Sequence, residues 1–388
     1  MGTLMEMDKT YVANTYGRFP VEIESGKGSI VKDTSGKEYI DMGSGIGVTA
    51  FGIGDDEWKA AVIAQLDKVQ HTSNLYYTEP CAKLAKLLCE KSGMKKVFFG
   101  NSGAEANECA IKVARKYAAD KHGADHYTII TLINSFHGRT LTTLAATGQD
   151  VFHKLFQPLT PGFVNVPAGD LELLKKTAKE TKAAGILIEC IQGEGGVVPL
   201  EKEYIQGIAE FCKKEDIVFM VDEVQTGNGR TGKMYSYQNF DVQPDVVSTA
   251  KGVGGGLPLG ACLIGDKVEF TLGGGDHGST FGGNPISCAG GISIIERMND
   301  EFFANVAKKG EYIKKELEGA SGIESVTGMG LMLGIKTTKP AKDVVNKCIE
   351  DGVLCLTAKD KVRLLPALNI PDDVLAKAVA VIKNAAAL

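Results

Sequence analysis

The sequence predicts an α/β fold with two domains: a large domain on a mostly parallel central sheet, and a smaller α+β domain. The chain has 388 residues, of which 44% are hydrophobic, and this is more than one ordinary core takes up. From residue 97 to residue 264, short apolar runs alternate with longer stretches of helical spacing. After residue 285 long helices and short strands follow. We therefore expect residues 51–285 to form the large domain and 286–388 the small one, which residues 1–50 join.

The first ninety residues predict a small antiparallel sheet followed by helices. Apolar segments between residues 21 and 40 are broken by Ser25-Gly26-Lys27-Gly28 and by Thr34-Ser35-Gly36-Lys37. Breaks of this kind are typical of tight turns between antiparallel strands. Residues 44–48 are a glycine-rich connection. Helical spacing then predicts helices at 56–69 and 80–90.

The alternating region predicts the large sheet. We expect strands at 97–99, 128–132, 186–188, 217–221, 246–247 and 261–264. We expect helices at 104–121, 171–184 and 204–214. This alternation favours parallel strands with helices on both faces of the sheet.

The last hundred residues predict the smaller domain. We expect helices at 286–298, 302–319, 341–351 and 372–387. We expect short strands at 323–326, 331–335, 353–356 and 362–365. Helices and strands that are not in strict alternation are typical of an α+β arrangement.

Composition excludes several classes of function. The net charge is −5 and no basic stripe interleaved with aromatic residues occurs, so nucleic acid is not an expected partner. Nine scattered cysteines form no Cys-x-x-Cys pair and no His/Cys spacing suited to zinc, which predicts reduced thiols and no metal. Residues 1–10 lack the features of a signal peptide, and no apolar run is long enough to span a bilayer. We expect a soluble cytoplasmic enzyme or binding protein.

Two predicted strands end in groups that suit a cofactor. Asp222 ends the apolar run at 217–221, and Lys251 stands between the run at 245–250 and the glycine-rich residues 252–256. Ligands of open α/β sheets bind at the carboxyl ends of the strands. A partly desolvated lysine has a lowered pKa and attacks carbonyl groups. By themselves, the two residues fit surface groups at strand ends equally well.

A turn after the strand at 97–99 has two open interpretations. The segment Phe99-Gly100-Asn101-Ser102-Gly103-Ala104-Glu105 joins that strand to a helix. Ser102 and Glu105 have the spacing of a capping box. Alternatively, Ser102, Gly103 and Ala104 direct their N–H groups at a phosphate, helped by the helix dipole. The segment lacks the lysine of a P-loop.

Three further segments carry candidate binding groups. Phe136 and Arg139 follow the strand at 128–132 and suit stacking on a planar ring and binding of a carboxylate; a core Phe and a surface Arg are the alternative. Glu189 and Glu194 follow the strand at 186–188, either as solvated loop residues or as partners of nearby arginines. Arg363 is a cation inside an apolar strand, where it needs a partner. It is a carboxylate-binding candidate or half of a structural ion pair.

A further loop, His277-Gly278-Ser279-Thr280-Phe281, is also rich in hydroxyl groups and glycine. Together these motifs resemble those of the class III (ω-amino-acid) aminotransferases. From Tyr16 to Arg363 they occur in the same order as in that family. The resemblance implies fold type I and the cofactor pyridoxal 5'-phosphate. It implies that Lys251 bonds to the cofactor and then moves a proton between two carbon centres. Asp222 would keep the ring nitrogen protonated, and Gln225 would bind the phenolic oxygen.

The resemblance also implies the rest of the cofactor site. Phe136 would stack on the ring, and His137 belongs to the cofactor-binding set. Thr280 would reach the phosphate of the other subunit, which makes the protein a homodimer with shared sites. The phosphate itself would be held by Ser102, Gly103 and Ala104.

Within the class, the match is best to the acetylornithine aminotransferase group. It rests on residues 14–21, 45–48 and 135–140, and on Ile46, where ornithine δ-aminotransferases have a tyrosine. An apolar residue there leaves room for an acylated amine. The implied reaction moves the terminal amino group of N-acetylornithine to 2-oxoglutarate, giving glutamate, in arginine biosynthesis.

The resemblance implies a switch between two substrates. Arg363 would bind the α-carboxylate of 2-oxoglutarate or glutamate, and Arg139 the distal carboxylate. For acetylornithine, Arg139 and Tyr16 would bind the carboxylate, while Glu194 pairs with Arg363 and hides its charge. Ser279 completes the implied substrate-binding set.

Departures and alternatives accompany this interpretation. Cys190 stands where the family usually has proline, and residues 51–56 lack the usual histidines. Ornithine, succinylornithine and 4-aminobutyrate are the alternative donors. A glutamate-semialdehyde aminomutase shares the fold and the lysine but needs no arginine switch. A catalytically dead relative serving as a scaffold is disfavoured by the intact Asp222, Gln225 and Lys251.

Overall fold

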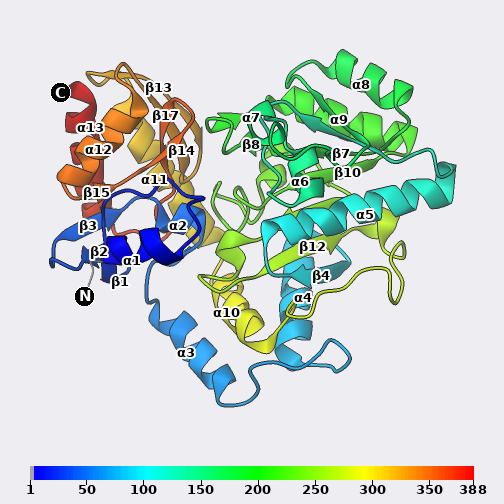
Figure 1. The fold of residues 1–388 in the computed structure, drawn as a ribbon, viewed down its shortest axis with the longest axis horizontal. Coiled ribbons are helices and arrows are strands. Elements are labelled where there is room, and N and C mark those ends of the chain that lie inside the picture. Colours follow the sequence, from blue (N-terminus) through cyan, green and yellow to red (C-terminus); the bar gives the residue numbers. More distant parts are fainter. Residues whose placement is uncertain (1–3) are drawn as a thin grey trace.

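The computed structural model describes residues 4–388 and has two lobes (Figure 1). The larger lobe is built on a seven-stranded sheet, and the smaller lobe on two four-stranded sheets. The sequence predicts no signal peptide in residues 1–10, and the first three residues of that stretch lie outside the described part of the chain. Within the described part, no helix is both long and apolar enough to cross a membrane.

The central sheet is mostly parallel, which confirms the predicted α/β class. Its order is β4-β12-β11-β10-β7-β5-β6, and β12 alone in this sheet runs against its neighbours β11 and β4. Its strands are β4 (Lys96–Gly100), β5 (Thr128–Leu132), β6 (Phe163–Val166), β7 (Ala183–Ile188), β10 (Val218–Asp222), β11 (Val246–Thr249) and β12 (Gly260–Ile264).

Helices cover both faces of this sheet. On one face lies α5 (Gly103–His122), and on the other lie α8 (Leu171–Glu180) and α9 (Lys202–Glu215) (Figure 1). Alternate residues of β10 serve the two cores: Val218 and Met220 pack with α5, and Phe219 and Val221 with α9. Because successive side chains point to opposite faces and both faces are covered by helices, β10 is apolar from Val218 to Val221.

Some elements differ from those predicted. The helix predicted at 171–184 ends at Glu180, because Ala183 already belongs to β7. β6 was not predicted: it is a short edge strand whose Asn165 donates to Thr131 of β5, so its pattern is not an apolar run. The short helices that were also missed are α1 (Leu4–Tyr11), α2 (Ser44–Gly47), α6 (Leu141–Ala146) and α7 (Asp150–His153).

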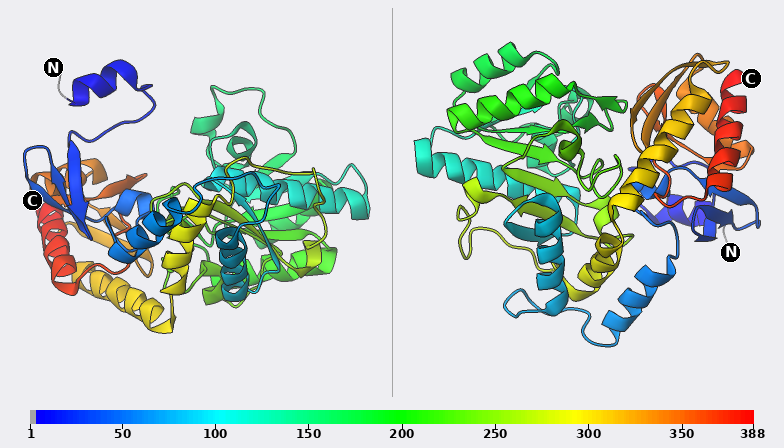
Figure 2. Two further views of the ribbon diagram at one scale, coloured as in Figure 1. Left: turned by 90° about the horizontal axis from the view of Figure 1, so that it is seen from below. Right: turned by 180° about the vertical axis from the view of Figure 1, so that it is seen from behind.

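The smaller lobe holds two sheets packed with helices. One sheet has the order β1-β2-β3-β15 and the other β13-β14-β17-β16. The strands are β1 (Ile23–Lys27), β2 (Ile30–Asp33), β3 (Glu38–Asp41), β13 (Ile323–Met329), β14 (Met332–Thr337), β15 (Val353–Leu354), β16 (Leu356–Ala358) and β17 (Lys361–Leu364). The helices are α11 (Asp300–Leu317), α12 (Ala341–Glu350) and α13 (Asp372–Ala387) (Figure 2).

The strand predicted at 353–356 is divided between the two sheets. Val353 pairs in parallel with Ile40 of β3, while Leu356 pairs with Arg363 of β17. The N-terminal hairpin and the C-terminal segment are thereby joined by backbone hydrogen bonds. The boundaries at residues 50 and 285 stay predictions.

Helices near the lobe junction pack with one another. The helix α10 (Pro285–Glu296) contacts α3 (Asp56–Leu66) and α4 (Glu79–Ser92) (Figure 1). The remaining short elements are β8 (Ile191–Gln192), β9 (Val198–Pro199), η1 (Ser236–Phe240), η2 (Lys251–Val253) and η3 (Asp266–Val268).

Strand direction brings distant segments to one edge of the central sheet. β4, β5, β7, β10 and β11 all run the same way, so the segments after them emerge together. Asp222 is opposite Ser248 in register, and Val221 is opposite Ile188. Asp222, Glu189 and Lys251 therefore leave the sheet at the same edge.

Candidate active site

A cavity of about 460 Å³ lies at this edge of the sheet. It lies between the start of α5, the loop after β5, and the ends of β7, β10 and β11. Its volume is in the range of sites for small molecules and cofactors. Most of the predicted cofactor-binding residues line it: Ser102, Gly103, Ala104, Phe136, His137, Asp222, Gln225 and Lys251.

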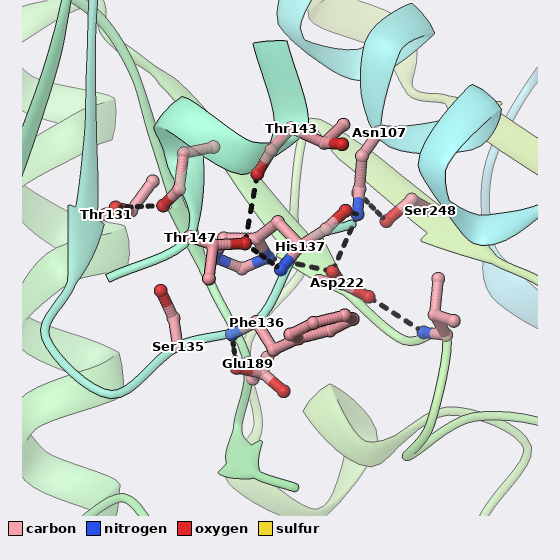
Figure 3. Close-up of polar contacts among 12 residues, drawn as sticks. Asn107, Thr131, Ser135, Phe136, His137, Thr143, Thr147, Glu189, Asp222 and Ser248 are labelled. Atoms are coloured by element: carbon pink, nitrogen blue, oxygen red, sulfur yellow. Dashed lines mark hydrogen bonds and ion pairs between the residues drawn. The ribbon is translucent and has the colours of Figure 1, made fainter. Parts of the chain in front are cut away.

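Asp222 sits in the floor of the cavity inside a polar network (Figure 3). Its Oδ2 accepts from Asn107 Nδ2 at 2.8 Å and lies 2.8 Å from His137 Nδ1. Its Oδ1 accepts the N–H of Val224 at 2.9 Å. Asn107 in turn accepts from Ser248 Oγ. These contacts fix the direction of the carboxylate, whose side chain is almost fully buried.

Lys251 has an unusual backbone and a perturbed amine. Its φ of 49° lies in the left-handed region, which costs energy for a residue with a side chain. Asn228 stabilises the preceding turn by donating to Thr249 Oγ1 and Ala250 O at 2.9 and 3.0 Å. Burial lowers the pKa of Lys251, with Asp222 and Glu194 acting in the opposite direction. A lowered pKa leaves more of the amine neutral and nucleophilic.

At the start of α5 the structure has an N-cap at Ser102, although Glu105 accepts from Asn101 N–H and Ser102 Oγ and does not complete a capping box; the phosphate interpretation stays a prediction. Ser102 Oγ accepts the N–H of Glu105 at 3.2 Å, so the N-cap is present. The same turn borders the cavity, where the first N–H groups of a helix have no intrahelical partner. A Cβ at Gly103 would stand 2.6 Å from Val224 Cγ1. A Cβ at Gly260 would stand 2.2 Å from Ser102 O, so glycine is required for this close approach.

The loop after β5 presents an aromatic ring and a cation. Phe136 is partly buried and lines the cavity. Arg139 is exposed, with its guanidinium 5.4 Å from the ring centre of Phe136 and 4.1 Å from that of Phe152. Stacking on two rings orients a cation without neutralising it. Arg139 is therefore held at the cavity with its charge available.

Glu189 is a second acid in the floor of the cavity, and it has no arginine partner among the described residues. Its two oxygens accept the N–H groups of Phe136 and Gly193 at 3.0 and 3.3 Å. Burial and the charge of Asp222 raise the pKa of Glu189 to about 7, while His137 and the N–H donors oppose that rise. The sequence interpretations of Glu189, a solvated loop residue or an arginine partner, were both wrong.

Arg363, Glu194 and Gln225 form a closed group, which we call the gate. Arg363 Nη1 donates to Glu194 Oε1 at 2.5 Å and to Gln225 Oε1 at 3.2 Å. Gln225 Nε2 donates to the same Glu194 oxygen at 3.3 Å. Burial raises the pKa of Glu194, but Arg363 outweighs it and the net direction is down. Arg363 is almost fully buried, and its Nε has no partner among the described residues.

Several residues singled out in the sequence do not line the cavity of the single chain, among them Tyr16, Ile46, Ser279 and Thr280. Tyr16 is 70% exposed and borders a different groove with Arg18. Thr280 is exposed, whereas the Ser279 Oγ accepts from Asn101 beside the turn before α5. Ile46, in α2, has a φ of 65°, an unfavourable value for a β-branched residue.

The two departures from the family pattern have structural roles. Cys190 is buried, and its carbonyl accepts the N–H of Leu200. In the segment 51–56, Asp55 caps α3 and forms a two-pronged pair with Arg297 at 2.7 and 3.0 Å. Arg297 also lies over the ring of Phe51. All nine cysteines are free thiols.

Sequence reasoning missed three residues that support the site. Asn107 and Ser248 orient Asp222, and Phe152 holds Arg139. The available signal was a polar Asn107 on the otherwise apolar face of α5, where a buried amide needs partners. Phe152 lies in a short helix that the periodicity did not reveal.

The residues present fit pyridoxal 5'-phosphate. An aromatic face, a buried acid, an amine with lowered pKa and a helix N-terminus all border one cavity. These match the ring, the ring nitrogen, the carbonyl and the phosphate of the cofactor in chemical character. Glycines at 103 and 260 keep side chains out of the turn that would receive the phosphate.

Comparison with known proteins agrees with this geometry. The acetylornithine aminotransferase of Haemophilus ducreyi is 49% identical over 381 residues, which cover 98% of this chain and 97% of that protein. That of Methanocaldococcus jannaschii is 43% identical, with 95% and 94% covered.

Solved structures agree as well. An ornithine aminotransferase from Toxoplasma gondii, with partial occupancy of PLP at its active site, has a TM-score of 0.94 at 30% identity, with 99% of this chain and 93% of that one covered. The N-acetylornithine aminotransferase of Stenotrophomonas maltophilia has a TM-score of 0.84 at 33% identity, with 98% of each chain covered. The profile of the family described as aminotransferase class-III matches residues 11–386. The chain belongs to the class-III aminotransferases, a family of enzymes that depend on pyridoxal 5'-phosphate.

Proposed function

We propose that the protein transfers the terminal amino group of N-acetylornithine to 2-oxoglutarate, in the cytoplasm, as a step of arginine biosynthesis. The observation that carries the proposal is the gate, in which Glu194 neutralises the buried Arg363 and both contact Gln225, which lines the cavity. High identity to acetylornithine aminotransferases over nearly the whole chain supports the choice of donor.

Separate groups of residues would hold the ring nitrogen, the ring face and the phosphate of the cofactor. Pyridoxal 5'-phosphate supplies a ring that accepts the electron pair left on carbon when a proton departs. Asp222, oriented by Asn107 and His137, would pair with the ring nitrogen. The start of α5 would bind the phosphate, and Phe136 would cover the ring. Lys251, with its lowered pKa, would bond to the cofactor and then carry the proton between the two carbon atoms.

The gate would let one site bind two different substrates. N-acetylornithine brings one carboxylate, which Arg139 and Tyr16 would bind. Glu194 then stays on Arg363, so that no unpaired cation faces the apolar part of the donor. 2-Oxoglutarate brings two carboxylates, one for Arg139 and one for Arg363 once Glu194 has moved away, and Ser279 would be a further substrate-binding residue. Gln225 would bind the phenolic oxygen of the cofactor.

A homodimer with shared sites is part of the proposal. Leu75, Tyr76 and Tyr77 are 86%, 70% and 106% exposed, and Phe281 is 60% exposed. Asn74 joins these segments by donating to carbonyls of the 279–282 loop. An apolar patch of this kind is typical of an interface. It adjoins Thr280, which would reach the phosphate of the partner subunit.

A half-reaction screen tests the proposal. The purified protein with bound cofactor is mixed with N-acetylornithine, ornithine, succinylornithine or 4-aminobutyrate, and the visible absorbance of the lysine-linked cofactor is followed. We expect N-acetylornithine to bleach it at the lowest concentration and 2-oxoglutarate to restore it. Faster conversion by free ornithine would overturn the donor assignment. A protein that takes up no cofactor, or whose colour is unchanged in Lys251→Ala, would overturn the enzyme assignment.

A further inference from the structure

Glu189 lies where two loops of the site meet. It directly follows β7, its side chain is 5% exposed, and it lines the cavity. Its Oε2 accepts the N–H of Phe136, in the loop after β5, at 3.0 Å (Figure 3). Its Oε1 accepts the N–H of Gly193, in the turn between β8 and β9, at 3.3 Å. One buried carboxyl therefore holds the backbone of both loops.

Two further contacts join the same loops. Gln192 Nε2 donates to Ile133 O at 2.9 Å. Gly195 packs against Asn134 so closely that a Cβ would stand 2.6 Å from the carbonyl oxygen. Glu189 differs from these residues because it lines the cavity and holds the peptide next to the gate.

The Gly193 peptide is in direct contact with the gate. A Cβ on Gly193 would stand 2.4 Å from Gln225 Oε1, so no space separates the two. The next residue is Glu194, whose Oε1 is the meeting point of Arg363 Nη1 and Gln225 Nε2. A shift of the Gly193 peptide would move this oxygen away from both donors. Hydrogen bonds weaken steeply when distance and angle change.

We propose that Glu189 is a positioning residue that sets how firmly the gate closes, by fixing the Gly193 peptide against the loop that carries Phe136. The inference rests on the proposed function, in which Glu194 stays on Arg363 while the donor is bound. Without this hold, the Glu194 carboxylate samples more positions, and the closed gate is less populated. The donor half-reaction then weakens, while the 2-oxoglutarate half-reaction, which needs the open gate, does not.

Two variants of Glu189 test this in separated half-reactions of the holoenzyme. In Glu189→Gln the amide oxygen still accepts one N–H group, but the amide nitrogen cannot accept the other. Glu189→Ala removes both hydrogen bonds. We expect the apparent affinity for N-acetylornithine to fall about tenfold in Glu189→Gln and further in Glu189→Ala. We expect the affinity for 2-oxoglutarate to change by less than about twofold. Equal losses in both half-reactions would overturn the inference.

The two half-reactions of wild type and of the Glu189 variants distinguish an error in the proposed function from an error in the role of Glu189. If wild type converts neither substrate, the proposed function is wrong. If wild type converts both and the Glu189 variants lose both equally, the inference is wrong. Gln192→Ala is the matched control, because it cuts the contact to Ile133 while the Gly193 N–H stays held. We expect this control to keep the wild-type ratio of the two affinities.

A double variant tests whether Glu189 acts through Glu194. Glu194→Gln weakens the gate directly by removing the charge that faces Arg363. If Glu189 works by positioning Glu194, then adding Glu189→Gln to Glu194→Gln causes no further loss in the donor half-reaction. Losses that add in full would contradict the proposed route.

Hydrogen exchange gives a readout that does not depend on turnover. In the holoenzyme, Glu189→Ala should speed amide exchange at both Gly193 and Phe136, because it removes the carboxyl oxygens that accept these two N–H groups. Amides of α13, far from the site, should exchange at the wild-type rate. Unchanged exchange at both Gly193 and Phe136 would show that Glu189 does not hold the loops.

Discussion

Replacing Glu189 by glutamine should change how the stability of the protein depends on pH. Burial, with a further contribution from Asp222, raises the pKa of Glu189 from 4.5 to about 7. His137 and the two N–H donors act in the opposite direction. A carboxyl with a higher pKa in the folded state binds its proton more tightly when folded. Its contribution to stability is therefore complete below the unfolded pKa and is lost as pH rises through the folded one.

The magnitude follows from these two values. The difference between 4.5 and about 7 corresponds to about 3 kcal/mol, at about 1.4 kcal/mol per pH unit. Most of this, about 2–3 kcal/mol, is lost between pH 5 and pH 8. Glutamine does not titrate, so wild type should lose about 2–3 kcal/mol relative to Glu189→Gln over that interval.

Urea denaturation of both proteins at fixed concentration, at pH 5, 6, 7 and 8, measures this difference. Titratable groups that do not interact with Glu189 are common to both proteins and cancel in the difference. Glu172→Gln, on an exposed part of α8, is the control and should leave the pH dependence unchanged. A stability difference that is constant with pH, or that grows in favour of wild type at high pH, would refute the reasoning.

Three other substitutions test the site and its support. Arg363→Ala should weaken the 2-oxoglutarate half-reaction roughly hundredfold, through lost charge-assisted hydrogen bonds, and the donor half-reaction far less; equal losses in separated half-reactions would contradict the switch. Gly103→Ala places a methyl 2.6 Å from a methyl of Val224, and should lower cofactor affinity about tenfold in an absorbance titration. Asp55→Asn should cost about 1–2 kcal/mol in urea at pH 7 through the pair with Arg297. That cost should shrink below about pH 4, because the pKa of Asp55 is lowered; a pH-independent cost would refute it.

Much of the large lobe could be predicted because its signals are local. The run 217–221 is apolar on both faces, and such a run is best satisfied by a parallel strand between two layers of helices. The same rule placed Asp222 and Lys251 at one edge of the sheet. By contrast, β6 and the divided strand at 353–358 depend on partners far away in the chain. Their short, partly exposed sequences carry little periodic signal.

The chemical groups of the site were predictable, but their partners were not. A lysine after an apolar strand and an arginine within one are visible in the sequence. The two N–H groups that bond Glu189 belong to residues 53 positions before it and 4 after it. Likewise Asn107 reaches Asp222 across 115 positions. Side-chain hydrogen bonds to distant backbone follow from the packed fold, so no local pattern announces them.

Backbone strain falls on Lys251, which lines the cavity, and on Ile46, which lies apart from it. Lys251 and Ile46 both have positive φ angles, which side-chain-bearing residues avoid at a cost of about 1–2 kcal/mol each. At Lys251 the neighbouring turn is held by two hydrogen bonds from Asn228, and Trp58 donates to Gly254 just beyond it. These contacts offset the strain and keep the amine aimed at the cavity before any ligand arrives. In the proposed mechanism the lysine therefore need not reorganise to react, which is how a rigid scaffold favours the reacting geometry.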